Sequence, residues 1–362
     1  MAESDRENRI PTKIKTHRKR PNQSSEGNPA IKKRVVLGEL TNISIDVLGR
    51  TQNSGMAKTR KRKPESVLEK AGNWGQLELV VSPGFDEPQK VGYASSIYQH
   101  LHSLEVEVKR RPLSNYMEKV QEDINPCMRA VLVDWLVEVA EEYRLVSDTL
   151  YLTVNYIDRY LSAHKLLRNK LQLLGVSCML VASKYEEISP PHVEDFCYIT
   201  DNTYTKDEVV DMERDVLKFL DYDMGNPTTK TFLRIFTTVA QENPAFSNLQ
   251  FDFLCNYLAE LSLLDYCCVR YVPSMVAASA VFLARLTIQP KFHPWTLALQ
   301  KHTGYKPCEL KECVLKLHNL LLTSEVAGRA VRQKYMDHKL KCVASMNPPL
   351  EIPPSFFEVS HE

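Results

Sequence analysis

The residues of this chain that could act as nucleophiles or metal ligands are its nine cysteines and ten histidines. Cys267 or Cys308, with His302 nearby, could form a thiol nucleophile with its base. Most cysteines, however, stand among apolar residues at helical spacing, where thiols are usually inert, and no glycine-rich loop accompanies them. No paired Cys-x-x-Cys motifs supply a zinc site. The sequence therefore predicts reduced core cysteines, no catalytic residue, no metal and no cofactor, with an enzyme left as an alternative.

Charge is unevenly distributed along the chain. Residues 1–63 contain 16 Lys or Arg against 6 Asp or Glu, whereas residues 64–362 contain 30 against 39. A nucleic-acid-binding domain would concentrate Lys and Arg on its own surface, so we expect no nucleic-acid partner. No apolar run is long enough to span a membrane, and the polar N-terminus lacks the apolar block of a signal peptide. We therefore expect a soluble intracellular protein with no membrane partner.

Residues 1–90 are predicted to be a disordered regulatory tail, because few apolar residues are available to offset the entropy of ordering. The tail contains a dense basic cluster of the kind that nuclear import receptors bind, which predicts a nuclear protein. A solubilising role of these charges is the alternative. The cluster consists of Lys58, Arg60, Lys61, Arg62 and Lys63. A short apolar island at residues 35–40 interrupts the polar tail and is expected to meet a partner.

From residue 91 onward, apolar residues recur at helical spacing and alternating strand patterns are absent. Residues 125–145 carry two apolar faces, which predicts a central helix whose Met/Trp face is either core or a groove floor. Ser147 and Thr205 are predicted N-caps. Further helices are predicted at residues 97–111, 148–161, 170–187, 191–197 and 205–220, and then at 228–239, 249–264, 273–286, 295–302 and 307–323.

The helical region contains an internal repeat. Met179-x-x-Ala182-Ser183 recurs as Met275-x-x-Ala278-Ser279, and two other short motifs recur at offsets near 100 residues. Such a period indicates two duplicated domains rather than a solenoid. Glycine and proline near residue 225 mark the boundary. We predict domains at 91–225, with its preceding helix, and at 226–345, followed by a flexible tail at 346–362.

Several long motifs resemble the cyclin family, and its A-type branch in particular. They are MRAVLVDWL from Met128, YIDRYLS from Tyr156, LQLLGVSCMLVASKYEEI from Leu171 and YVPSMVAASAVFLAR from Tyr271. The tail motifs RVVLGELTN and KTRKRK resemble the third A-type group of plant cyclins. The resemblance implies an all-α fold of two tandem five-helix cyclin boxes, preceded by an N-terminal helix and a disordered basic tail.

The same resemblance implies the function of a non-enzymatic regulatory subunit. It would bind a cyclin-dependent Ser/Thr protein kinase as a heterodimer, activate it, help recruit substrates and control progression from S phase to mitosis. The alternative is a cyclin-box protein similar to a general transcription factor. That class would be expected to have basic helices in the second repeat and a Cys-rich zinc ribbon before the first, and the sequence contains neither.

Residue by residue, the resemblance assigns three sites. The kinase-binding site comprises Lys184, Glu213, Val181, Tyr185 and Tyr222. A docking patch for Arg-x-Leu motifs of substrates and inhibitors comprises Met128, Val131, Leu132, Trp135 and Gln172, with an acidic rim of Glu138 and Asp201. A degron read by the mitotic ubiquitin ligase comprises Arg34, Leu37, Leu40 and Asn42. From the residues alone, Lys184 and Glu213 would only be expected to pair with each other or with nearby carbonyls.

Overall fold

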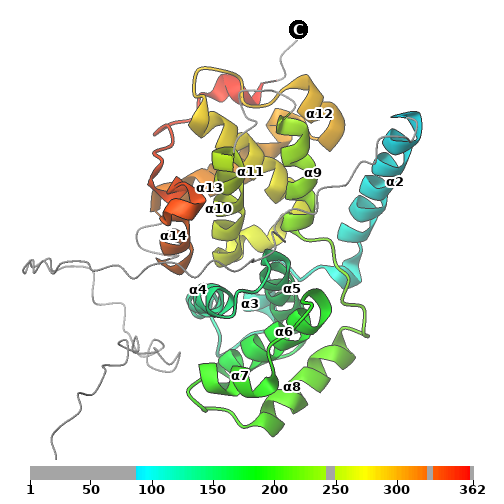
Figure 1. The fold of residues 1–362 in the computed structure, drawn as a ribbon, viewed down its shortest axis with the longest axis vertical. Helices are drawn as coiled ribbons and strands as arrows, with labels where there is room; N and C mark the ends of the chain where they lie inside the picture. The colour runs from blue at the N-terminus through cyan, green and yellow to red at the C-terminus, as the bar shows by residue number, and fades with distance from the viewer. Residues whose placement is uncertain (1–86, 242–248, 324–328, 359–362) are drawn as a thin grey trace, which may run out of the picture. The chain divides into compact units, whose positions relative to one another are not determined.

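The computed structural model describes residues 87–241, 249–323 and 329–358 (Figure 1). These residues form helices, turns and irregular segments and contain no strand, so the predicted all-α fold is confirmed. None of their helices is long and apolar enough to span a membrane. The predicted degron and basic import cluster lie outside the described residues.

Each half of the folded region contains five α-helices, as predicted. The first box has α4 (Pro126–Glu142), α5 (Ser147–Ala163), α6 (Leu171–Glu186), α7 (Val193–Ile199) and α8 (Lys206–Phe219). The second has α9 (Thr229–Gln241), α10 (Leu249–Leu264), α11 (Pro273–Ile288), α12 (Leu297–Thr303) and α13 (Pro307–Thr323). In the described part of the chain, the first box is preceded by α2 (Glu87–Glu105), the 3-10 helix η1 (Val108–Arg110) and α3 (Tyr116–Lys119). The second box also contains the 3-10 helix η4 (Tyr266–Arg270), and it is followed by α14 (Arg329–Tyr335) and by short 3-10 turns that include η7 (Pro354–Phe357).

Two helices form the centres of the two boxes. Every residue from Leu171 to Ser183 in α6 is buried, and α11 is buried over almost its whole length. The repeated small pairs, Ala182-Ser183 and Ala278-Ser279, are fully buried on these helices. Small side chains let neighbouring helices approach closely. The repeat found in the sequence therefore marks the two central helices.

The helix at residues 126–142, predicted to be central, lies instead at the junction of the two boxes. Besides α5 and α6 of its own box, α4 contacts α10, η4 and α14 (Figure 1). Its apolar residues therefore meet neighbours from both boxes, although Met128, Val131 and Trp135 remain only partly buried. A pattern of two apolar faces shows that a helix is covered on both sides but does not show by which domain.

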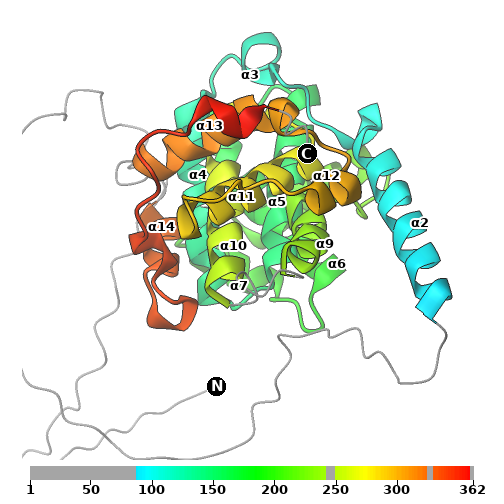
Figure 2. The same cartoon turned by 90° about the horizontal axis from the view of Figure 1, so that it is seen from above.

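Helix α2 precedes the first box in sequence but packs against the second. The Tyr98 hydroxyl donates to the Thr303 carbonyl over 2.9 Å, and the Tyr98 ring contacts the rings of Phe232 and Phe236. At its end, the Glu105 carboxylate accepts from the Ser274 backbone N–H and hydroxyl, at 2.9 and 2.6 Å. Figure 2 shows α2 at the edge of the helices, beside α9 and α12.

The prediction of a flexible C-terminal tail is wrong as far as residue 358. Ile352 and Phe357 are buried, and the Phe357 ring stacks on Phe282 with 5.4 Å between ring centroids. The His318 Nε2 atom lies 2.6 Å from the Pro349 carbonyl oxygen. The prolines in residues 346–358 suggested a flexible segment. They are also compatible with an ordered, non-helical segment whose apolar side chains pack on the second box.

The two predicted N-caps have different outcomes. Thr205 caps α8 in a capping box, in which its hydroxyl accepts from the Glu208 N–H and the Glu208 carboxylate accepts from the Thr205 N–H. Ser147 is not a cap, because α5 begins with that residue. Instead, the Glu187 carboxylate at the end of α6 accepts hydrogen bonds at the start of α5, from the Val146 N–H at 2.8 Å and the Thr149 hydroxyl at 2.7 Å.

The capping box leads to a pH-dependent prediction. The hydrogen bond from Lys170, together with that from the Thr205 N–H, lowers the pKa of Glu208 to about 2 from an ordinary 4.5. Its stabilising effect should be complete above pH 4.5 and disappear as the pH falls through about 2. We expect Glu208→Gln to lower the free energy of unfolding in urea at pH 7, with a deficit that shrinks in acid. Asp207→Asn is the matched control, and a deficit independent of pH would contradict the assignment.

Candidate functional site

Lys184 and Glu213 form an ion pair between two helices of the first box. Lys184 lies in the last turn of α6 and Glu213 in the middle of α8, and their Nζ and Oε1 atoms are 2.6 Å apart. The Lys184 side chain is 48% exposed, whereas that of Glu213 is 11% exposed. The two residues therefore pair within the free chain, as the residues alone suggested, while the ammonium group stays accessible to a partner.

Exposed aromatic residues accompany this pair. Tyr185 and Tyr222 are 50% and 62% exposed, which is unusual for large apolar rings and typical of surfaces that meet a partner. Tyr222 follows α8 with a φ of 56°. The Tyr185 hydroxyl lies so close to Gly225 that a β-carbon there would be 2.8 Å from it. Val181, by contrast, is only 4% exposed and belongs to the core beneath, so it offers a partner little surface.

Two further exposed apolar residues belong to the same end of the box and were missed by the sequence prediction. Ile188 follows α6 and is 96% exposed, and Val108 in η1 is 87% exposed. The 3-10 helix is held beside the end of α8 because Arg110 donates to the Gly225 carbonyl and pairs with Asp223. The sequence signal that could have indicated an exposed Ile188 is its place between the polar residues Glu187 and Ser189, outside any helix.

The predicted docking patch has an exposed upper layer and a buried floor. Met128, Val131 and Trp135 are partly buried on α4, whereas Leu132 and Gln172 are buried beneath them. A β-carbon at Gly175 of α6 would lie 2.8 Å from Leu132 Cδ1, so only glycine lets this leucine sink between the helices. Leu132 and Gln172 therefore shape the patch from below.

The two acidic residues assigned to the patch rim are both exposed. Glu138 lies on α4, and Asp201 lies in the turn after α7 with a φ of 56°. The structure brings the apolar residues of the patch together on α4 and α6, whereas Asp201 lies on a separate turn.

A buried ion pair that the sequence prediction did not single out lies where the two boxes meet. Arg129 Nε and Nη2 donate to Asp158 at 2.6 and 2.7 Å, and Arg129 Nη1 donates to the Leu263 carbonyl of the second box at 2.7 Å. The Tyr116 hydroxyl donates to the same carboxylate. Burial disfavours the charged guanidinium, but the neighbouring Asp158 carboxylate keeps the pKa of Arg129 above its ordinary value. The sequence signal that could have indicated this contact is the charged Arg129 among the apolar residues of α4.

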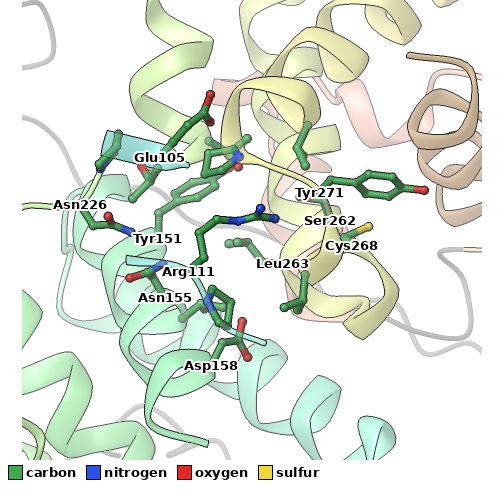
Figure 3. A pocket seen from close by; sticks show the side chains of 18 of the residues that line it. Glu105, Arg111, Tyr151, Asn155, Asp158, Asn226, Ser262, Leu263, Cys268 and Tyr271 are labelled. Atoms are coloured by element: carbon green, nitrogen blue, oxygen red, sulfur yellow. The ribbon is translucent and has the colours of Figure 1, made fainter. Parts of the chain in front are cut away.

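This ion pair borders a cavity of about 100 Å³ between the boxes (Figure 3). Other polar side chains around it are Glu105, Arg111, Asn155 and Asn226. The Asn155 and Asn226 Oδ1 atoms are buried without a hydrogen-bond partner among the described residues. Cys268 also lines the cavity, and burial raises the pKa of its thiol, so the reactive thiolate is disfavoured. The cavity is therefore lined by polar groups at the meeting of the two boxes, and its Cys268 thiol is not activated as a nucleophile.

Three cysteines are more exposed than their apolar sequence surroundings predict. Cys127, Cys267 and Cys308 are exposed, so Cys127 and Cys267 are not the core residues that their apolar neighbours suggested. Cys127 and Cys308 lie in the first turns of α4 and α13, and Cys267 lies in the 3-10 helix η4. Side chains at such positions can face solvent even where the neighbouring residues are apolar. No group of three His, Cys, Asp or Glu side chains in the described ranges could hold a metal ion.

Comparisons with known proteins agree on one family. The family model "Cyclin, N-terminal domain" matches residues 96–225, and "Cyclin, C-terminal domain" matches residues 227–349. The chain is 52% identical over 352 residues to Cyclin-A3-4 of Arabidopsis thaliana, covering 96% of this chain and 95% of that relative. It is 59% identical over 278 residues to Cyclin-A3-2 of Oryza sativa subsp. japonica, covering 76% and 71%.

Two further comparisons extend this result. The chain is 53% identical over 334 residues to the "G2/mitotic-specific cyclin C13-1" of Daucus carota, covering 91% of this chain and 97% of that relative. Its fold resembles that of a viral cyclin from herpesvirus saimiri, with a TM-score of 0.54 and 19% identity, covering 63% and 96%. The resemblance seen in the sequence is confirmed: the chain belongs to the cyclin family, in its A-type branch, and is similar to the A3 group of plant cyclins.

Proposed function

We propose that this protein is a non-catalytic subunit that binds and activates a cyclin-dependent Ser/Thr protein kinase. The observation that carries the proposal is the Lys184–Glu213 pair with the exposed rings of Tyr185 and Tyr222 beside it, in a chain of the cyclin family. The apolar rings supply contact area, and the charged pair supplies hydrogen bonds that fix a partner's orientation.

The mechanism follows from what protein kinases need. Phosphoryl transfer requires a glutamate on a mobile kinase helix to pair with the lysine that positions ATP. A rigid surface that binds only the inward position of that helix shifts the kinase population towards the active state. Helices α6 and α8 are rigid because their inner faces are buried, and the cyclin itself contributes no reacting group.

Reconstitution with a kinase tests the proposal. The full chain is mixed with each of several monomeric cyclin-dependent kinases, and complex formation and phosphorylation of a basic Ser-Pro peptide are measured. A one-to-one complex with activity far above that of the kinase alone would support the proposal. Neither binding nor activation with any of the kinases would refute it and favour a partner of another class, such as a transcription complex.

We also propose that the α4 patch recruits substrates and inhibitors with Arg-x-Leu motifs. The partly buried Met128, Val131 and Trp135 would hold the leucine, and the exposed Glu138 and Asp201 would attract the arginine. We expect Trp135→Ala to lower kcat/KM on substrates with the motif by about tenfold, since a buried aromatic anchor is typically a hot spot. Short peptides without the motif serve as the control. An equal loss on both would indicate that Trp135 serves the core.

For the tail we propose control of abundance and location. Arg34, Leu37, Leu40 and Asn42 would form a degron for the mitotic ubiquitin ligase, and the cluster at residues 58–63 would direct the protein to the nucleus. The carrot relative's name, which refers to G2 and mitosis, fits action between S phase and mitosis. We expect replacement of Arg34 and Leu37 by alanine to lengthen the protein's half-life several-fold in mitotic extract. An unchanged half-life would reject the degron.

A further inference from the structure

The segment between α6 and α7 presents a serine followed by proline. It is fixed at both ends, because Glu187 accepts from the Val146 N–H and the Thr149 hydroxyl, and the His192 N–H donates to Asp195 over 2.8 Å. Between these ends Ser189 is exposed, and its neighbour Ile188 is 96% exposed. The serine is thus held out from the surface at a defined place.

The backbone around Ser189 is free to bind in another protein's cleft. In the described part of the chain, residues 188–191 form no hydrogen bond through backbone or side chain. A proline at position 190 disfavours the helical conformation for Ser189, which lies with Ile188 in a bend outside any helix. The chain has two Ser-Pro pairs, Ser82-Pro83 and Ser189-Pro190, and no Thr-Pro. Ser189-Pro190 is therefore an accessible, non-helical sequence of the type that proline-directed kinases accept.

Two lysines share a pocket with this serine. The open pocket, of about 530 Å³, is lined by Ser189 together with Lys184, Lys206, His192 and one acidic residue, Glu194. Lys206 pairs with Glu194 at 2.7 Å, and both side chains are more than half exposed. Lys184 is the same residue that pairs with Glu213 in the proposed kinase-binding site. A dianion attached to Ser189 would therefore form next to two ammonium groups.

We propose that Ser189 is phosphorylated by a proline-directed Ser/Thr kinase and that the phosphate weakens kinase binding by engaging Lys184. In the reaction the Ser189 hydroxyl oxygen bonds to the γ-phosphorus of ATP, the β–γ phosphoanhydride bond breaks, ADP leaves and the hydroxyl proton passes to the modifying kinase. The site itself is independent of the proposed function, whereas the effect on binding rests on it.

The charge balance explains the effect on Lys184. A phosphoserine carries about −1.5 to −2 charges at pH 7 and three acceptor oxygens, whereas Glu213 offers a single negative charge. The half-exposed Lys184 side chain can turn without unpacking the core. When Lys184 turns to the phosphate, Glu213 loses its ion-pair partner. The phosphate also repels acidic groups on the surface of a partner kinase. We expect kinase affinity to fall by roughly tenfold, as for the loss of one charge-assisted contact.

Mass spectrometry tests the site. The full-length chain is incubated with ATP and several proline-directed kinases, and phosphopeptides are mapped for the wild type, Ser189→Ala, Ser189→Thr and Ser82→Ala. Phosphate on residue 189 in the wild type, Ser189→Thr and Ser82→Ala, but absent from Ser189→Ala, is the expected result. Modification restricted to other positions with every kinase would overturn the proposal.

Binding measurements test the consequence. Affinity for a monomeric cyclin-dependent kinase is compared between phosphorylated and unphosphorylated chains, with Ser189→Ala carried through the same treatment to show the effect of phosphate elsewhere. A loss of about tenfold in the wild type alone is expected. Equal affinity of both forms would overturn the switch. An unmodified chain that binds no kinase would instead contradict the proposed function, and the mass measurement would still decide the site.

Discussion

Replacing Lys184 and Glu213 together by alanine is expected to lower affinity for the partner kinase at least 100-fold and to abolish activation. Charged groups at the centre of a protein interface commonly contribute 2 to 5 kcal/mol when one side is truncated, which is about 30-fold to several thousandfold in affinity. The fold should survive, since the Lys184 side chain is 48% exposed. Binding is measured by calorimetry and folding by circular dichroism.

A charge exchange separates the pair's two possible roles. In Lys184→Glu/Glu213→Lys the two side chains can still form an ion pair within the chain, but they present reversed charges to a partner. We expect this variant to fold like the wild type and to fail to bind the kinase. Full activation by the exchanged variant would mean that the pair only supports the packing of α6 on α8.

The largest effect on stability is expected at Arg129. Arg129→Met leaves the Asp158 carboxylate, which is 5% exposed, without its bidentate partner and removes the donor to the Leu263 carbonyl of the second box. Breaking a buried ion pair in this way typically costs about 3 to 5 kcal/mol, a large share of a domain's stability. Urea unfolding followed by circular dichroism measures the loss.

Arg159 provides a matched control for this prediction. It lies next to Asp158 on α5 and is also buried, with 5% exposure against 1% for Arg129, but its Nε and Nη1 atoms have no hydrogen-bond partner in the described residues. Burial accordingly lowers the pKa of Arg159. Arg159→Met should therefore cost much less than Arg129→Met, because no buried partner is left behind. Equal losses would indicate that arginine packing, rather than the ion pair, stabilises the junction.

Periodicity and the internal repeat were sufficient to predict the ten α-helices of the two boxes, whereas the helix predicted at residues 97–111 begins and ends earlier, as α2. Helices α10 and α13 have the predicted limits, and most of the other helices differ by one or two residues at either end. The reason is local: apolar spacing, Thr205 as a cap and Pro273 at a helix start are all properties of short segments. The repeated Ala-Ser pairs, from which the sequence predicted two duplicated domains, lie on the buried helices α6 and α11, since close packing requires small residues.

What the sequence did not reveal depends on contacts between distant segments. Neither the partner of Arg129 nor the packing of α2 on the second box follows from periodicity, because Arg129 meets Leu263 across 134 residues and Glu105 meets Ser274 across 169. Phe357 was assigned to a loose tail because its neighbours are prolines, whereas its environment is set by Phe282. For the kinase-binding residues, the resemblance located the pair, but only the structure separated the buried Val181 from the exposed tyrosines.

The position of α2 limits how freely the halves of such proteins can be exchanged. A hybrid that joins residues 1–225 of this chain to the second half of a relative would retain Tyr98 and Glu105 but lose their own partners. The incoming half would have to supply rings where Phe232 and Phe236 stand, and a hydroxyl where Ser274 stands. Although the sequence repeat indicates two duplicated halves, the contacts of α2 make them complementary rather than interchangeable, and recombination at their boundary should succeed only between similar relatives.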